Sequence, residues 1–179
     1  MNIAQNVFII SSSVAISAPA FAADYLTDIQ AQKIIFSKAD KFVKVNIELN
    51  DDQLDSIKSK SGVRQRTKKP LIWKAEIKGE ALGYFFVDEV IGKHEYITYA
   101  LGINTKGETI GIEIMSYRET HGGEVKDSNW RSKFVGKKIT DPFKLDVDVP
   151  NISGATLSCR NVLDGVKRLL VLHEMVKNG

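Results

Sequence analysis

Residues 71–117 read LIWKAEIKGEALGYFFVDEVIGKHEYITYALGINTKGETIGIEIMSY, and this stretch decides the fold. It contains four runs rich in β-branched and aromatic residues, separated by short polar connections that contain glycine. Connections this short join antiparallel strands, because a parallel crossover needs a dozen or more residues. The predicted strands are Leu71–Ile77, Ala81–Ile91, Tyr96–Ile103 and Thr109–Ser116.

The last of these runs shows the face that we expect to be buried. Ile110, Ile112 and Ile114 occupy every second position. Side chains two residues apart in a strand lie on the same face of the sheet. We therefore predict that all three isoleucines face one core.

Helical patterns flank the predicted sheet, and together they indicate an α+β fold with an antiparallel sheet of hairpins. The C-terminal pattern has apolar residues at helical spacing, so we expect an amphipathic helix that packs on the sheet. Predicted helices are Thr27–Phe36 with Thr27 or Asp28 as its cap, a helix that starts at Asp51 and ends near Gly62, Asp127–Phe134 and Leu157–Val176; Lys41–Leu49 is a further strand candidate. One domain is expected over residues 23–179, with a helical part at 23–69 and the sheet with the ligand segment at 70–179.

The segment Ser153-Gly154-Ala155-Thr156 precedes the last predicted helix. Small residues let the backbone approach a ligand closely, and a helix N-terminus offers unpaired N–H groups and a positive dipole end to a phosphate. Serine and threonine are also ordinary N-cap residues, so the same letters are compatible with a plain helix start.

Two further blocks lie upstream of this segment in a fixed order. The first reads Tyr117-Arg118-Glu119-Thr120-His121-Gly122-Gly123, and the second runs from Trp130 to Lys137. The three blocks together resemble the FMN-binding domain family, which includes the C subunit of the sodium-pumping NADH:quinone oxidoreductase, the G subunit of Rnf complexes and many small extracytoplasmic flavoproteins. The resemblance covers the chain from about Tyr96 to the end.

The resemblance implies a covalent flavin. In that family a flavin transferase joins FMN through its phosphate to the last threonine of the S/T-G-A-T motif, which here is Thr156. It implies that Gly154 and Ala155 permit close approach, that Ser153 caps the helix and contacts the phosphate, and that Leu157 lies beside the cofactor. Glu119, Thr120, Gly122 and Gly123 are expected to line the ring or the ribityl chain.

The first 22 residues resemble a secretory leader. Residues 1–22 contain no charged side chain, carry apolar stretches and end in Ala20-Phe21-Ala22, an A-x-A cleavage pattern. The apolar stretch is interrupted by serines and is short for a membrane span. We expect cleavage near Ala22 and a periplasmic or otherwise extracytoplasmic protein.

The net charge and the spacing of the histidines give little support to nucleic-acid binding or metal binding. The net charge of +3 does not argue for nucleic acid. The basic run at residues 64–69 is interpreted as a solvated loop, with contact to acidic lipid or an acidic redox partner as the alternative. The three histidines, His94, His121 and His173, show no metal-ligand spacing.

Four side chains near the motifs have two possible roles each. Cys159 is the single cysteine, so no internal disulfide can form; it is expected to be packed and inert, with a reactive thiol as the alternative. His121 is expected either to shape a turn or to contact the flavin ring. Trp130 and Phe134 are expected to pack in the core, with flavin contact as the alternative.

We predict an extracytoplasmic electron-transfer flavoprotein that exchanges electrons with membrane or periplasmic redox proteins. A tethered flavin supplies the redox chemistry, and no acid/base dyad or nucleophilic triad is recognised, so a carrier is favoured over a stand-alone enzyme. The alternatives are a flavin-dependent reductase that acts on a small acceptor and a flavin-free binding module on the same fold.

Overall fold

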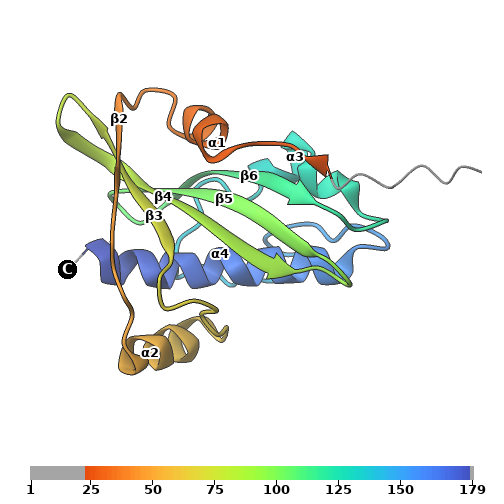
Figure 1. The fold of residues 1–179 in the computed structure, drawn as a ribbon. Coiled ribbons are helices and arrows are strands. Elements are labelled where there is room, and N and C mark those ends of the chain that lie inside the picture. The colour runs from red at the N-terminus through yellow and green to blue at the C-terminus, as the bar shows by residue number, and fades with distance from the viewer. Residues whose placement is uncertain (1–22, 178–179) are drawn as a thin grey trace, which may run out of the picture.

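The computed structural model describes residues 23–177. Their centre is a six-stranded antiparallel sheet in the order β1-β6-β5-β4-β3-β2. Helix α1 lies on one face of the sheet and the long helix α4 runs along the other (Figure 1). The strands are β1 (Ala23–Asp24), β2 (Lys41–Lys44), β3 (Leu71–Ile77), β4 (Glu80–Ile91), β5 (Tyr96–Asn104) and β6 (Thr109–Tyr117). The helices are α1 (Asp28–Ile35), α2 (Asp51–Ser61), the 3-10 turn η1 (Gly123–Lys126), α3 (Ser128–Ser132) and α4 (Thr156–Lys177). The predicted α+β fold class is confirmed.

The hairpin turns have the sequence signals that their geometry requires. Lys78 and Gly79 join β3 to β4 with φ angles of 51° and 86°, as in a type I′ turn. At the turn between β5 and β6, the Asn104 side chain accepts hydrogen bonds from the backbone N–H groups of Lys106 and Glu108 at 2.9 and 3.0 Å. These local features define the turns of two of the hairpins.

Two helix starts are fixed by reciprocal capping. Thr27 precedes α1; its side chain accepts a hydrogen bond from the N–H of Gln30, and its own N–H donates to the side-chain oxygen of Gln30. Asn50 and Gln53 form the same box at α2, which ends where Gly62 adopts φ 78°. The predicted cap at Thr27 and the predicted end near Gly62 are confirmed.

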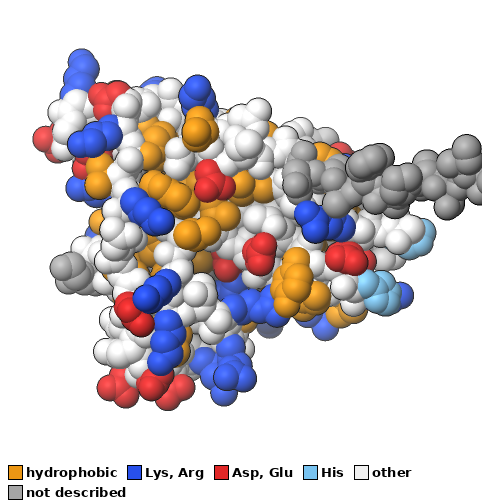
Figure 2. All heavy atoms as spheres, in the orientation of Figure 1, with side chains coloured by type: hydrophobic (Ala, Val, Ile, Leu, Met, Phe, Trp, Pro, Cys, Tyr) orange, Lys and Arg blue, Asp and Glu red, His pale blue; other side chains and the backbone are white. Residues whose placement is uncertain are grey.

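The sheet separates two hydrophobic cores. The larger core lies between the sheet and α4, and it includes the fully buried Tyr99, Phe86, Phe134 and Leu163. The smaller core lies under α1 around Ala31, Phe36 and Phe85. Figure 2 shows that hydrophobic side chains also remain open to solvent on this second face, with acidic and basic side chains interspersed among them.

The prediction that Ile110, Ile112 and Ile114 share one face is wrong for Ile110. The pairing between β5 and β6 shifts after Gly102↔Gly111 to Ile103↔Thr109, which leaves Ile110 as the extra residue of a β-bulge. Ile110 therefore packs against the core under α1, whereas Ile112 and Ile114 are buried in the core under α4.

The predicted strand at Lys41–Leu49 is too long. Strand β2 ends at Lys44, and the last bond to β3 runs from the N–H of Val45 to the carbonyl of Ile72. Beyond this point β3 is preceded by Pro70, which has no N–H to extend the ladder. Leu49 leaves the sheet and is buried in the core under α4.

The short helix after β6 spans less than the predicted Asp127–Phe134. Helix α3 ends at Ser132 and continues as turns to Phe134. Trp130 and Phe134 are both buried, with ring centroids 5.0 Å apart in an edge-to-face arrangement. The expected core role of both rings is confirmed.

The predicted leader at residues 1–22 lies outside the described residues. Between residues 23 and 177, none of the helices combines the length and the apolar character that a bilayer span requires.

Candidate functional site

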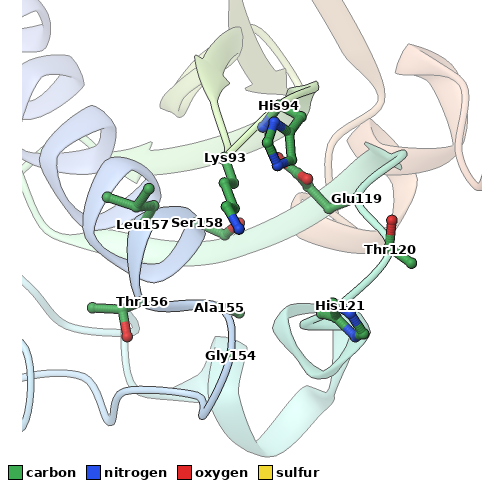
Figure 3. A pocket seen from close by; sticks show the side chains of 10 residues that line it. All are labelled: Lys93, His94, Glu119, Thr120, His121, Gly154, Ala155, Thr156, Leu157 and Ser158. Atoms are coloured by element: carbon green, nitrogen blue, oxygen red, sulfur yellow. The ribbon is translucent and has the colours of Figure 1, made fainter.

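Three segments meet around a cavity of about 430 Å³ at one end of the sheet (Figure 3). They are the hairpin between β4 and β5, the loop that follows β6, and the first turn of α4. Because β4 and β6 run in the same direction, their C-terminal ends lie at the same end of the sheet. The lining residues are Lys93, His94, Glu119, Thr120, His121, Gly154, Ala155, Thr156, Leu157 and Ser158.

Thr156 is the first residue of α4 and is exposed at the cavity. Ser153 and Gly154 form a turn in which Gly154 has φ 79°, and the N–H of Ala155 donates to the carbonyl of Ile152 at 3.0 Å. The first helical hydrogen bond runs from the N–H of Cys159 to the carbonyl of Ala155. The hydroxyl of Thr156 therefore lies at the end of the helix where backbone N–H groups lack helical partners.

The expectation that Ser153 caps α4 is wrong. The helix begins at Thr156, so Ala155 holds the capping position, and a methyl side chain cannot accept a hydrogen bond. Ser153 lies in the preceding turn and is exposed. The first turn of α4 also carries no acidic side chain, so its N-terminal dipole is not neutralised from within the helix.

Gly122 brings the loop after β6 against the start of α4. It has φ 85°, and a Cβ atom placed on it would lie 2.1 Å from the Cβ of Ala155. Only glycine allows both this backbone conformation and this approach. Gly122 therefore packs against the start of α4, and it is not among the cavity-lining residues.

Tyr117 holds the same loop through a hydrogen bond. Its hydroxyl donates to the carbonyl of His121 at 2.5 Å, and the Ser158 hydroxyl lies 3.4 Å from it. Burial raises the pKa of the Tyr117 hydroxyl, which keeps this group protonated as a donor. The backbone carbonyl of His121 thus helps to shape the turn. His121 also lines the cavity.

Glu119 holds the hairpin between β4 and β5. Its Oε1 accepts hydrogen bonds from the backbone N–H groups of His94 and Glu95 at 2.6 and 3.1 Å. Burial acts to raise the pKa of Glu119, but the backbone N–H groups of His94, Glu95 and Lys93 outweigh it and hold the pKa below its usual value. The carboxylate is therefore a structural acceptor at the cavity wall.

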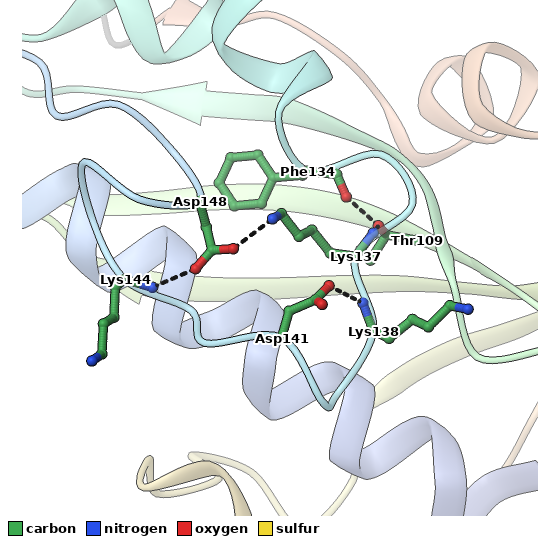
Figure 4. Close-up of polar contacts among 7 residues, drawn as sticks. All are labelled: Thr109, Phe134, Lys137, Lys138, Asp141, Lys144 and Asp148. Carbon is green, nitrogen blue, oxygen red and sulfur yellow. Dashed lines mark hydrogen bonds and ion pairs between the residues drawn. The ribbon is translucent and has the colours of Figure 1, made fainter.

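The segment before the Ser153–Thr156 motif is held by its own polar contacts (Figure 4). Asp148 pairs with Lys137 at 2.5 Å and accepts from the backbone N–H of Lys144 at 2.9 Å. The bond to the Lys137 ammonium, with that N–H, lowers the pKa of Asp148. The Trp130 indole N–H also donates to the carbonyl of Pro150 at 2.9 Å. These contacts fix the chain three residues before the motif.

Cys159 lies behind the site and not in it. The thiol is completely buried, and burial raises its pKa. A buried thiol with a raised pKa is a poor nucleophile. The expected packing of Cys159 is confirmed.

Sequence reasoning named six of the residues that line the cavity as cofactor contacts: Glu119, Thr120, Gly154, Ala155, Thr156 and Leu157. Ser153, Gly122 and Gly123 do not line it; Gly123 opens the turn η1. Lys93, His94 and Ser158 were missed. The signal for the first two was the strand order, because a hairpin that leaves β4 must lie at the same end of the sheet as the loop that leaves β6.

The residues present fit FMN. A cavity of about 430 Å³ falls within the size range of small-molecule sites. Its wall offers a helix N-terminus to an anionic phosphate, and it offers the apolar Ala155 and Leu157 to a ring. In the part of the chain that the structure describes, no group of three or more histidine, cysteine or acidic residues is placed to hold a metal ion.

Comparisons with known proteins confirm the resemblance inferred from the motifs. Residues 92–171 match the sequence profile of the FMN-binding domain family. The G subunit of the ion-translocating oxidoreductase complex of Shewanella oneidensis is 35% identical over 88 residues, which cover 43% of this chain and 42% of that protein. Its counterpart in Shewanella baltica is 33% identical over 87 residues, which cover 42% and 41%. The chain thus matches less than half the length of these relatives.

Solved structures share the fold across most of the chain. The crystal structure of Shewanella oneidensis NqrC superimposes with a TM-score of 0.55 and 16% identity, over 82% of this chain and 88% of that one. The C subunit of the Na(+)-translocating NADH-quinone reductase of Parabacteroides distasonis gives the same score and identity over 86% and 85%. At this identity the likeness concerns the fold alone.

Proposed function

We propose that this chain, whose residues 92–171 resemble the FMN-binding domain family, is an extracytoplasmic electron-transfer flavoprotein with FMN bound through a phosphoester to Thr156. The observation that carries the proposal is the position of Thr156. Thr156 is exposed, is the first residue of α4 and lines the cavity, inside the matched range. A phosphate there is attracted by the helix dipole before and after the ester forms.

The cofactor supplies one- and two-electron chemistry, and the chain supplies attachment and orientation. The Gly122–Ala155 contact and the Tyr117 hydrogen bond hold the loop after β6 against the attachment point. Glu119 is the one carboxylate among the ten lining residues, and its Oε1 is occupied by two backbone N–H groups. This carboxylate is engaged in holding the hairpin, which supports an electron carrier over a reductase that uses it to protonate a substrate.

Export and partners belong to the same proposal. The leader-like residues 1–22 support a location outside the cytoplasm, where a covalent bond retains the cofactor against dilution. A flavin transferase would form the ester, and membrane or periplasmic redox proteins would exchange electrons with the flavin. The named relatives are subunits of multi-subunit redox complexes, which supports partners of this kind.

Intact-mass measurement tests the attachment. The full chain is co-expressed with a flavin transferase as wild type, Thr156→Val and Ser153→Ala. Valine keeps the branched shape of threonine without its hydroxyl, and Ser153→Ala removes the neighbouring exposed hydroxyl as a matched control. We expect the mass of FMN minus water on the wild type and on Ser153→Ala, and none on Thr156→Val. The same spectra locate the mature N-terminus, expected at Ala23.

Two outcomes would contradict the proposal and favour one of the alternatives. A wild-type chain that carries only its polypeptide mass contradicts covalent attachment and favours a flavin-free binding module. A flavinylated chain that turns over a small acceptor with a simple reductant favours the flavin-dependent reductase.

A further inference from the structure

The hairpin between β4 and β5 carries a cation to the wall of the candidate flavin cavity. Lys93 lines this cavity, and Figure 3 shows its side chain directed across it toward Ser158 at the first turn of α4. Neither strand periodicity nor the motifs of the sequence indicated a role for this lysine. It lies outside the loop after β6 and outside the Ser153–Thr156 motif.

The backbone that carries Lys93 is fixed on both sides. Within the hairpin, the N–H of Gly92 donates to the carbonyl of Glu95 at 2.7 Å, and Glu119 accepts from the N–H of His94 at 2.6 Å. A Cβ atom on Gly92 would lie 2.3 Å from the Glu119 carboxylate, so the hairpin and the loop after β6 are in close contact. The lysine is therefore held at a defined place on the cavity wall.

A second anchor ties the hairpin to the helix that carries Thr156. The Asn161 side chain donates to the carbonyl of Ile91, the last residue of β4, at 2.7 Å. Asn161 follows Leu157 by four residues, so both lie on the same side of α4. The distance between the Lys93 backbone and the attachment point is thus set by secondary structure and not by a free loop.

The charge of Lys93 is not neutralised by its neighbours. Among residues 23–177 its ammonium forms no ion pair, and the negative charge of Glu119 on the same wall is shared by backbone N–H groups. An unpaired cation at a cavity wall acts on whatever charge develops inside. Lys93 is exposed, so water screens its effect in part.

We propose that the positive charge of Lys93 raises the reduction potential of the bound flavin. The inference rests on the proposed function. Oxidised FMN that takes up two electrons and one proton gains one negative charge on its ring system, with the electrons supplied by a redox partner protein or, in the test, by dithionite. The Lys93 ammonium stabilises that charge and therefore favours the reduced state.

Spectroelectrochemical titration of the flavinylated full chain tests this role. The variants are Lys93→Gln, Lys93→Arg and, as a control of equal charge change, Lys106→Gln. Lys106 lies in the turn beyond the far end of β5, about 30 Å from the hairpin at roughly 3.3 Å per strand residue. Each protein is first checked by intact mass for one FMN and by circular dichroism for an unchanged melting curve.

We expect Lys93→Gln to lower the ratio of reduced to oxidised flavin at a fixed potential by about tenfold, which corresponds to about 30 mV for a two-electron couple. Lys93→Arg and Lys106→Gln keep the wild-type potential. The difference shrinks when the salt concentration rises, because the lysine is exposed. An unchanged potential in flavinylated Lys93→Gln overturns this inference and leaves the proposed function intact. Absence of FMN from the wild type overturns the proposed function itself.

Discussion

Gly122 and Ala155 are in direct contact, although 33 positions separate them in the chain. A Cβ atom on Gly122 would lie 2.1 Å from that of Ala155, and Gly122 has φ 85°. This contact joins the loop after β6 to the start of α4. Ala155 and the neighbouring Thr156 both line the cavity.

Gly122→Ala tests this contact. The added methyl group meets Ala155 and also forces a left-handed backbone on alanine, so we expect a loss of about 2–4 kcal/mol of unfolding free energy. Gly136→Ala is the matched control, because Gly136 has φ 81° but no heavy atom within 4 Å of an added Cβ. The control loses about 1 kcal/mol from backbone strain alone. Urea unfolding measures both values, and equal losses would contradict the packing role of Gly122.

Glu119→Ala tests the clamp on the hairpin. It removes the acceptor of the His94 and Glu95 N–H groups, and we expect a loss of about 1–2 kcal/mol. Hydrogen exchange of the amides at residues 93–95 should rise selectively. Glu95→Ala is the control, since the Glu95 contact uses its backbone only. Unchanged hydrogen exchange in Glu119→Ala would show that the hairpin keeps its conformation without the Glu119 hydrogen bonds.

The pH dependence of the same clamp has a defined sign. The folded pKa of Glu119 is held below the ordinary value of 4.5, so the folded state favours the charged carboxylate. Its contribution to stability is present above pH 4.5 and is lost as the pH falls through the folded pKa. Acid unfolding of Glu119→Ala should therefore show a shallower pH slope below 4.5 than the wild type. A parallel slope would contradict this assignment.

His173 predicts a second loss of stability in weak acid. It is completely buried between the rings of Tyr84 and Phe86, at centroid distances of 5.4 and 6.5 Å. Burial lowers its pKa below 6.5, and the opposing effect of the Glu174 carboxylate, 3.5 Å from Nδ1, is smaller. Below pH 6.5 His173 takes up a proton in the unfolded chain but stays neutral in the folded chain. The free energy of unfolding therefore falls with pH until the folded pKa of His173 is reached.

His173→Phe should reduce this slope, which for one full proton is about 1.4 kcal/mol per pH unit. The measurement is the free energy of unfolding at pH 7.5, 6.5 and 5.5. His94→Gln serves as the control, because the His94 side chain is exposed at the hairpin. A slope in His173→Phe that equals the wild type would exclude His173 as the titrating group.

A buried ion pair fastens α4 to the sheet. The side chains of Arg168 and Asp88 are 2% and 9% exposed and are in contact, and the Tyr99 hydroxyl donates to Asp88 at 2.8 Å. Asp88→Ala leaves a buried guanidinium without its counterion, so we expect a loss of about 3–5 kcal/mol. The double variant Asp88→Leu with Arg168→Met should recover most of it. Lys68→Met, at an exposed pair, should cost less than about 1 kcal/mol.

Much of the fold could be predicted from local sequence. Lys78-Gly79 set one hairpin, Asn104 set another, and the capping boxes at Thr27 and Asn50 set two helix starts. The bulge at Ile110 could not be predicted, because a single extra residue does not change the alternating pattern that precedes or follows it. The end of β2 could not be predicted from local sequence either, since it depends on where its partner strand β3 stops.

The sequence by itself determined the chemistry of the candidate site: a threonine at the start of a helix, small residues before it and a glycine-containing loop upstream. These are short-range properties of residue type and spacing. Only the tertiary structure decided that Lys93 and His94 line the same cavity and that Glu119 clamps their hairpin. It also showed that Gly122 acts by packing on Ala155. The physical reason is that these contacts join strand ends that meet only when the sheet is assembled, and no local pattern records which ends will meet.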